Sequence, residues 1–260
     1  MLWLTTTLLR SMIFYYSATG NTRFAARYLA AKLSQRAVDI LENSDTPRID
    51  GTVGLMFPIY CWGIPPVVSK FIDKLMPEIT SDMYIWAACT CGDEAGVAMK
   101  KLDRIIKNSR GRGLDAVWSV IMPNTYVLLP GFDVDSPEVE KAKLEAAPGR
   151  LDRIAGYIEK HETGIYDVRQ GSMPALRSAI FPLFEKWGVS AKRWHVSDAC
   201  VGCGKCQRIC PARNIRLADG RPDWGNRCFS CCACYHCCPE KAISYANFTK
   251  GKSQYLCPLV

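Results

Sequence analysis

Two runs of cysteines with one shared spacing constrain this chain more than any other feature of its 260 residues. Residues 200–211 and residues 228–239 both read C-x2-C-x2-C-x3-C-P. This spacing wraps thiolates around a cubane iron–sulfur cluster. Zinc usually takes separated pairs of ligands, so eight cysteines in two identical runs, each closed by a proline, fit zinc poorly. The sequence therefore predicts two [4Fe–4S] clusters.

The spacing also predicts which cysteines share a cluster. Three closely spaced thiolates on a tight loop reach three irons of one cube, whereas the fourth begins a helical turn that points toward the other cube. The predicted ligands of the first cluster are Cys200, Cys203, Cys206 and Cys238. Those of the second cluster are Cys228, Cys231, Cys234 and Cys210. Two extra thiols, Cys232 and Cys237, are either small buried hydrophobic groups or alternative ligands.

The two runs form an internal repeat, because residues 210–215 mirror residues 238–243. This doubling resembles the two-cluster bacterial ferredoxins over roughly residues 192–248. The resemblance implies a small α+β ferredoxin domain, which we place at residues 192–260, with two [4Fe–4S] clusters at low potential.

The rest of the chain, nearly two hundred residues, is long enough for a core of its own. It contains no run of eighteen apolar residues, so we predict no membrane span. Residues 1–11 lack the cationic start and cleavage site of a signal peptide, and we expect an extension that does not matter to function. Ten of the fourteen cysteines lie between positions 200 and 238, which indicates metal binding rather than disulfides. We therefore expect a reducing, cytoplasmic and anaerobic setting.

Positive charge is concentrated in the cysteine-rich part. From residue 192 onward there are eleven Lys or Arg against four Asp or Glu, which accounts for +7 of the net charge of +8. A basic patch is one sign of nucleic-acid binding. Here each oxidised cubane with its four thiolates carries about −2, which offsets about four units of the excess. We therefore predict no nucleic acid and a redox partner with an acidic surface. The oligomeric state is left open.

A second motif lies near the N-terminus. The apolar residues 12–16 have strand character, and an amphipathic stretch begins at residue 23. Between them, hydroxyls and a glycine form a cradle that suits one phosphate, and the helix N-terminus adds N–H groups. The loop has no lysine, so it favours the single phosphate of FMN over a nucleoside triphosphate. The alternative is an ordinary strand–turn–helix with a capping residue. The loop residues are Ser17, Thr19, Gly20, Asn21 and Thr22.

Strands and helices alternate after this loop. Buried strands are expected at residues 52–57, 83–88 and 117–122, and the last helix at residues 136–162, with a break near Pro148-Gly149. Such alternation predicts a parallel, doubly wound α/β sheet. Ligands of these sheets bind at the carboxyl ends of the strands, where the polar loops of this chain also lie.

This part resembles the flavodoxin family, because the motif S-x-T-G-x-T at residues 17–22 stands where that family has its phosphate loop. The resemblance implies a five-stranded sheet over residues 12–163 and a bound FMN. Loops 59–63 and 89–93 take the positions of its two isoalloxazine-binding loops, with Tyr60 and Trp62 either stacking on the ring or packing the loop. The other predicted flavin contacts are Pro58, Gly63, Thr90, Cys91, Gly92, Asn124 and Tyr126.

Residues 164–191 separate the two domains and include an apolar segment at 175–187. We expect this segment to dock the domains together rather than to lie on a membrane surface. The whole chain resembles the flavodoxin–ferredoxin fusions called EFR1-family ferrodoxins. That resemblance implies an intracellular protein that relays electrons between two [4Fe–4S] clusters and FMN, with no catalytic residue. The alternatives are a flavin-dependent reductase of a small acceptor, fed by its own clusters, and a redox-sensing binding module.

Overall fold

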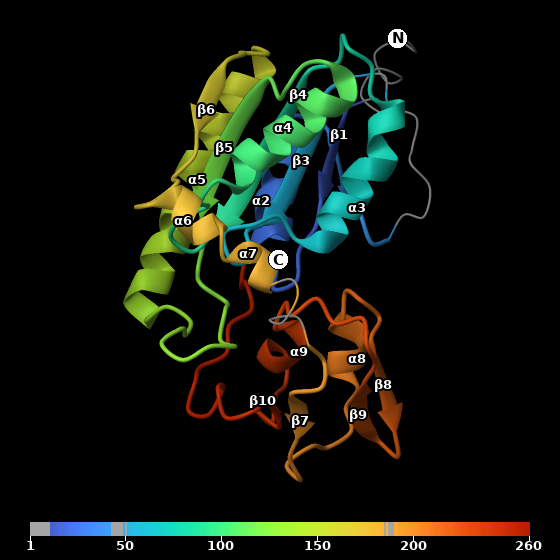
Figure 1. The fold of residues 1–260 in the computed structure, drawn as a ribbon. Helices are drawn as coiled ribbons and strands as arrows, with labels where there is room; N and C mark the ends of the chain where they lie inside the picture. The colour runs from blue at the N-terminus through green and yellow to red at the C-terminus, as the bar shows by residue number, and fades with distance from the viewer. Residues whose placement is uncertain (1–10, 43–48, 50, 185, 187–189) are drawn as a thin grey trace, which may run out of the picture.

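A six-stranded parallel sheet forms the centre of the N-terminal part of the chain (Figure 1). The computed structural model describes residues 11–42, 49, 51–184, 186 and 190–260. The strands are β1 (Met12–Tyr15), β2 (Arg36–Asp39), β3 (Val53–Pro58), β4 (Ile85–Cys91), β5 (Ala116–Ile121) and β6 (Ile165–Asp167). They are arranged β2-β1-β3-β4-β5-β6, and the order of the first five is the flavodoxin-like order of doubly wound sheets.

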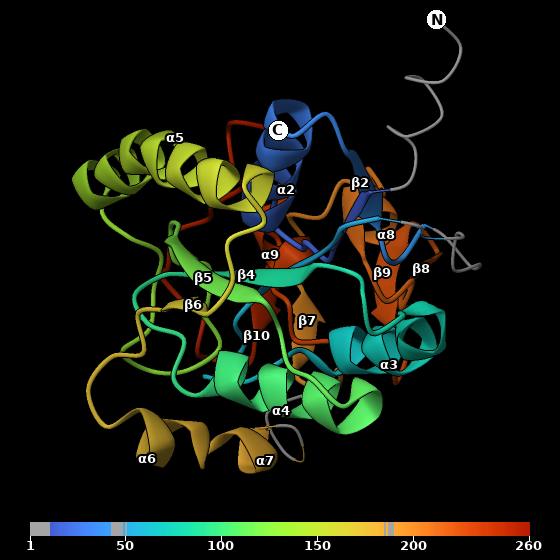
Figure 2. The same cartoon turned by 90° about the horizontal axis from the view of Figure 1, so that it is seen from above.

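Helices cover both faces of this sheet (Figure 2). On one face lie α2 (Asn21–Lys32) and α5 (Pro137–Glu159), and on the other lie α3 (Pro66–Leu75), the 3-10 helix η1 (Met76–Glu78) and α4 (Ala98–Arg110). Neighbouring strand residues point to opposite faces, so Ile13 packs in the core with α2 and α5, whereas Phe14 packs in the core with α3 and α4. The sheet is thus buried on both sides, as parallel sheets require.

Two details of the predicted sheet domain are wrong. The sheet has six strands instead of five, because the short β6 pairs with β5. Its residues are half-buried or exposed, so the sequence carries no apolar alternation that would reveal a strand. The predicted break at Pro148 is also absent, since α5 runs through it. Leu151 and Ile154 are fully buried against the sheet, and this packing outweighs the hydrogen bond that proline removes.

The cysteine-rich part forms a small α+β region beyond the carboxyl ends of the strands (Figure 1). Strand β7 (Trp194–Val196) pairs with β10 (Ile243–Tyr245), and β8 (Ile215–Ala218) pairs with β9 (Arg221–Trp224), both antiparallel. The short helices α8 (Lys205–Ile209) and α9 (Ala233–His236) follow the two cysteine loops. Val127 and Leu128, which follow β5, are buried in the core of this region, so the two parts share a core.

The segment between the two parts forms two short helices, α6 (Pro174–Ser178) and α7 (Phe181–Leu183). The Ser178 hydroxyl accepts a hydrogen bond from Val97 N and donates one to Trp62 O, which ties α6 to the start of α4. Residues 185 and 187 of the predicted apolar helix, and all but the last residue of the predicted extension 1–11, lie outside the described residues. None of the helices in the described part combines the length and apolar character that crossing a membrane requires.

Candidate functional site

A pocket opens at the carboxyl ends of β1, β3, β4 and β5, where the sequence predicts ligand binding. Its void has a volume of about 100 Å³ and opens to solvent. Most of the predicted flavin contacts line it, namely Ser17, Thr19, Asn21, Thr22, Pro58, Tyr60, Thr90, Cys91, Gly92, Asn124 and Tyr126. The fold therefore brings together residues that are more than one hundred positions apart in the sequence.

The loop after β1 has the chemistry of a phosphate cradle. The buried hydroxyls of Ser17 and Thr19 line the pocket, and within the described residues neither hydroxyl has a hydrogen-bond partner. Thr22 is different, because its Oγ1 lies 2.7 Å from Thr90 Oγ1 and the two hydroxyls are paired. The first N–H groups of α2 have no intrahelical acceptor. The loop thus offers unpaired hydroxyls and N–H groups to an anion.

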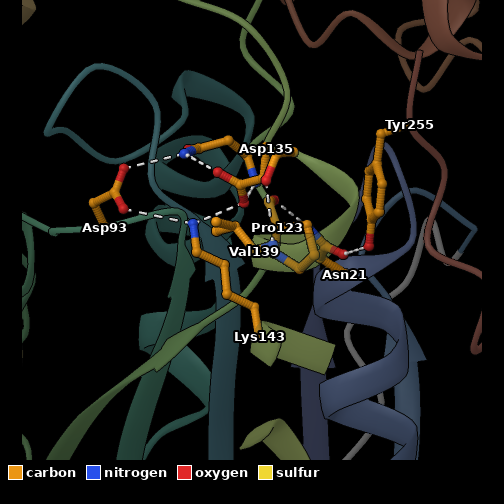
Figure 3. Close-up of polar contacts among 9 residues, drawn as sticks. Asn21, Asp93, Pro123, Asp135, Val139, Lys143 and Tyr255 are labelled. Carbon is orange, nitrogen blue, oxygen red and sulfur yellow. Dashed lines mark hydrogen bonds and ion pairs between the residues drawn. The ribbon is translucent and has the colours of Figure 1, made fainter. Parts of the chain in front are cut away.

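Asn21 supports the loop through its side chain (Figure 3). Its Nδ2 donates to Pro123 O over 2.9 Å, and its Oδ1 accepts from the hydroxyl of Tyr255 over 2.7 Å. The amide is buried and uses both ends on protein groups. Asn21 therefore fixes the start of α2 between the loop after β5 and the C-terminal segment.

Asn124 belongs to a polar network with Asp93, Asp135 and Lys143, and Figure 3 shows the last three side by side. Its Nδ2 donates to Asp93 and to Asp135 over 3.1 and 3.0 Å, and Lys143 lies 2.7 Å from Asp135. Burial opposes the charge on Asp135, but the hydrogen bonds from Lys143 and Asn124 lower the pKa of this carboxyl. A side chain at Gly92 would collide with Asn124. The loop after β4 can approach the network only because residue 92 is a glycine.

Aromatic side chains line the pocket and pack behind it, toward the cysteine-rich part. The hydroxyls of Tyr16 and Tyr60 lie 3.1 Å apart, and the Tyr16 ring packs edge-on against Phe229 with the centroids separated by 6.4 Å. Burial is the main cause that raises the pKa of both tyrosines well above the ordinary value, so both hydroxyls stay protonated. Tyr126 lines the pocket beside Phe184, with the ring centroids 6.2 Å apart.

Three predicted flavin contacts do not line the pocket: Gly20, Trp62 and Gly63. Cys61 and Trp62 both adopt positive φ angles in the turn that pairs Tyr60 with Gly63, and this turn directs the indole elsewhere. Trp62 Nε1 donates to Glu94 over 2.8 Å, and the Arg177 guanidinium lies over the ring. Of the two predicted stacking residues, Tyr60 therefore lines the pocket and Trp62 does not.

The eight predicted cluster ligands gather around two separate cavities. The outer cavity is lined by Cys200, Cys203, Cys206 and Cys238. The inner cavity is lined by Cys210, Cys228, Cys231 and Cys234, together with Cys232. Backbone N–H groups of Asn214 and Ala242 donate to the Cys210 and Cys238 sulfurs, both over 3.3 Å. Hydrogen bonds of this kind stabilise thiolates and tune the potential of a cluster.

Each cavity thus offers the thiols of four predicted ligands, and the inner cavity adds that of Cys232. Among the described residues, no group of three or more His, Cys, Asp or Glu side chains meets at a position for a single metal ion. The chemistry of this donor set fits a [4Fe–4S] cluster in each cavity, and whether the cavities hold clusters stays a prediction.

The inner cavity adjoins the pocket at the sheet edge. Ser230, Cys231 and Cys232 line the pocket, while none of the outer ligands does. The Cys232 and Cys237 thiols lie near the carbonyl oxygens of Ser230 and Cys234, with sulfur–oxygen distances of 3.6 and 3.4 Å. Burial raises the pKa of both thiols to about 12. Cys232 is thus buried and Cys237 half-buried beside the predicted ligands.

Several residues in or around the site were not predicted from the sequence. Phe184 lines the pocket, Tyr16 and Phe229 pack behind Tyr60, and the Tyr255 hydroxyl reaches Asn21. Their contacts join segments that are distant in the sequence, so no local sequence pattern predicts them. Cys257, to which the sequence assigns no role, donates from its backbone N–H to Thr19 O.

Comparison with known proteins gives one family match. A model of the 4Fe-4S binding domain family matches residues 194–216, which include the first cysteine run. A comparison with curated proteins gave no match.

Several solved structures are similar to parts of this chain. A flavodoxin from Fusobacterium nucleatum bound to flavin mononucleotide is 13% identical and covers 59% of this chain and 98% of its own, with a TM-score of 0.42. Rubredoxin oxygen:oxidoreductase from the anaerobe Desulfovibrio gigas is 18% identical over 58% of this chain, with a TM-score of 0.39, and only 36% of its own length is matched. A flavone reductase, 11% identical, covers 85% of each chain with a TM-score of 0.40.

The strand order and the family match together describe the architecture. A flavodoxin-like parallel α/β domain is followed by a cysteine-rich α+β region that contains a 4Fe-4S binding domain.

Proposed function

We propose that this chain is an electron-transfer protein that carries FMN and two [4Fe–4S] clusters. Its resemblance to the flavodoxin–ferredoxin fusions implies the same cofactors. FMN exchanges one or two electrons and each cubane exchanges one. The observation that carries the proposal is the shared wall between the pocket and the inner cavity. Cys231 and Cys232 line both, so a flavin and a cluster bound there would be neighbours.

The residues around the pocket have distinct roles in this proposal. Ser17, Thr19 and the first N–H groups of α2 bind the flavin phosphate, because their hydrogen-bond capacity faces the pocket. Tyr60 and Tyr126 cover the ring and exclude water from it. No residue in the pocket is needed as an acid, base or nucleophile for electron transfer.

The two cavities differ in their access to partners. Cys203 of the outer cavity is exposed, whereas Cys234 of the inner cavity is buried. We therefore propose that the outer cluster exchanges electrons with a partner protein and that the inner cluster serves the flavin. Beside α8, a cleft between the two parts is lined by four cations and two carboxylates, so it suits an acidic partner. The cations are Arg23, Lys205, Arg208 and Arg213, and the carboxylates are Asp39 and Glu42.

Substitution of Thr19 by alanine tests the flavin site. A hydrogen bond to a charged group contributes about 1.5–3 kcal/mol, so Thr19→Ala should weaken FMN binding by about ten- to a hundredfold. Riboflavin, which lacks the phosphate, should bind weakly to both proteins. Fluorescence titration under anaerobic conditions measures these affinities. Ser119→Ala is the control, because Ser119 is a buried hydroxyl of β5 that accepts from Arg169 N and does not line the pocket. Equal affinities of the wild type for FMN and riboflavin would refute the phosphate site.

A further inference from the structure

We propose that the C-terminal strap, residues 254–260, is the outer wall of the flavin phosphate loop, and that Tyr255 is a positioning residue for phosphate binding. This inference rests on the proposed FMN site. It links the end of the cysteine-rich region to a loop at the other end of the sequence.

The strap lies directly against the loop. Cys257 N donates to Thr19 O over 2.8 Å, and the Tyr255 hydroxyl donates to Asn21 Oδ1 over 2.7 Å. Tyr255 and Cys257 are each only 4% exposed. A Cβ on Gly20 would lie 2.8 Å from the Cys257 Cβ, closer than carbon atoms normally approach. The contact is therefore a packed interface and not a loose tail.

The hydrogen bond from Cys257 orients a donor of the loop. In a trans peptide the C=O and the N–H point in opposite directions. Because Thr19 O points to the strap, the N–H of Gly20 points away from the strap. This N–H has no acceptor among the described residues. The strap thus fixes the orientation of the Thr19–Gly20 peptide, which lies between two residues that line the pocket, Thr19 and Asn21.

The bond from Tyr255 fixes the helix start. Asn21 is the first residue of α2, and its amide is held between Tyr255 on one side and Pro123 O on the other. Loss of the Tyr255 hydroxyl leaves the amide oxygen of a buried side chain without this donor. Asn21 and the first turn of α2 would then lose the constraint that aligns their N–H groups.

The strap is anchored on the helix that carries cluster ligands. Tyr255 N donates to His236 Nδ1 over 3.1 Å, and Gln254 Nε2 donates to the carbonyl oxygens of Tyr235 and Cys238 over 2.6 and 2.9 Å. His236 belongs to α9, between the inner ligand Cys234 and the outer ligand Cys238. A chain of hydrogen bonds thus connects the ligand-bearing helix with the phosphate loop.

Titration of the cluster-loaded wild type and of Tyr255→Phe with FMN and with riboflavin tests this inference. We expect FMN to bind about fivefold more weakly to Tyr255→Phe, the effect of one ordinary hydrogen bond, and riboflavin to bind both proteins equally. Deletion of residues 256–260 removes the Cys257 N–H. It should weaken the binding of FMN, but not that of riboflavin, by at least about fivefold. Tyr28→Phe is the matched control, because Tyr28 also lies on α2 but its hydroxyl donates to Asp152 on the exposed side.

The outcomes separate the strap from the flavin site itself. If FMN binds the wild type and Tyr255→Phe equally well, the strap inference is overturned while the FMN site stands. An equal loss of FMN and riboflavin affinity would also overturn it, because it would reveal a general structural role. If the wild type binds neither flavin, the proposed function fails, and the positioning role fails with it.

Discussion

At the scale of single residues, the polar groups around the phosphate loop divide into two kinds. Thr22 and Asn21 use their side chains on protein partners, whereas the Ser17 and Thr19 hydroxyls line the pocket without a partner in the described part of the chain. Leaving a buried hydroxyl without any partner costs about 1–3 kcal/mol, so such groups are retained where water or a ligand supplies the partner. This division distinguishes the groups that build the loop from those that we propose to bind the flavin phosphate.

The effect of a side chain at Gly20 on FMN binding can be predicted, with a side chain at Gly111 as the control. Gly20 and Gly111 both have positive φ, of 100° and 80°, but a Cβ on Gly111 would meet nothing, whereas one on Gly20 would strike Cys257. Alanine at either site should cost about 1–2 kcal/mol for the left-handed backbone. Gly20→Ala should additionally displace the strap and weaken FMN binding by more than about tenfold, while Gly111→Ala leaves it unchanged. Anaerobic thermal unfolding and flavin titration measure both effects, and similar FMN affinities for the two variants would contradict the prediction.

At the scale of elements, the two cysteine loops use the same backbone with different residues. The first loop has positive φ at Gly202 and Gly204, and the second has it at Ser230 and Cys232. These pairs occupy equivalent positions of the repeat, and each second member precedes a short helix, α8 or α9. Cys232 therefore stands where the first repeat has a glycine, which explains an extra thiol that the spacing alone leaves ambiguous.

The equivalence predicts opposite results for two adjacent cysteines. Cys232→Gly keeps the backbone conformation and removes no ligand, so iron content should stay at the wild-type value. Cys231→Ser removes a ligand of the inner cavity, so about half of the iron should be lost. Iron and sulfide analysis of anaerobically purified protein gives the answer. Loss of a cluster in Cys232→Gly would show that this thiol is a ligand after all.

The sequence predicts elements well where the signal is local. The strand and loop around residues 12–22 and the repeated cysteine spacing are such signals. Strand β6, the unbroken helix at Pro148 and the orientation of Trp62 depend on distant partners, so no local pattern reveals them. The strap is the extreme case, because Tyr255 and Asn21 are 234 positions apart and meet only when both parts of the chain are packed.

At the scale of the whole molecule, the two parts are held together by more than a linker. Val127 and Leu128 are buried in the cysteine-rich core, and Lys252 Nζ donates to the carbonyl oxygens of Val127 and Leu129 over 2.8 and 2.6 Å. His236 Nε2 adds a contact with Thr125 O at 2.8 Å. These contacts surround the pocket and keep the inner cavity beside it, which suits electron transfer within one chain.

The basic cleft beside α8 predicts how ionic strength affects exchange with a partner. An acidic ferredoxin used as electron donor should react more slowly as salt rises, because the screening length falls to about 8 Å at physiological ionic strength. Lys205→Glu with Arg213→Glu should slow the reaction further, since both residues line the cleft. Electron transfer between cluster and flavin within the chain should depend neither on salt nor on these two substitutions. Lys160→Glu, an exposed position at the end of α5, is the control. Stopped-flow rates that are independent of salt and of these charges would rule out this docking site.

The central claim, that one chain carries a flavin beside two clusters, is tested most directly by an anaerobic visible spectrum with cofactor counts. We expect about eight iron and eight sulfide per chain, since the eight predicted ligands line the two cavities, together with about one FMN. Flavin and cluster absorption should both bleach on reduction. Zinc in place of iron would contradict the central claim. So would a protein with its full iron content that neither retains FMN nor binds it again on reconstitution.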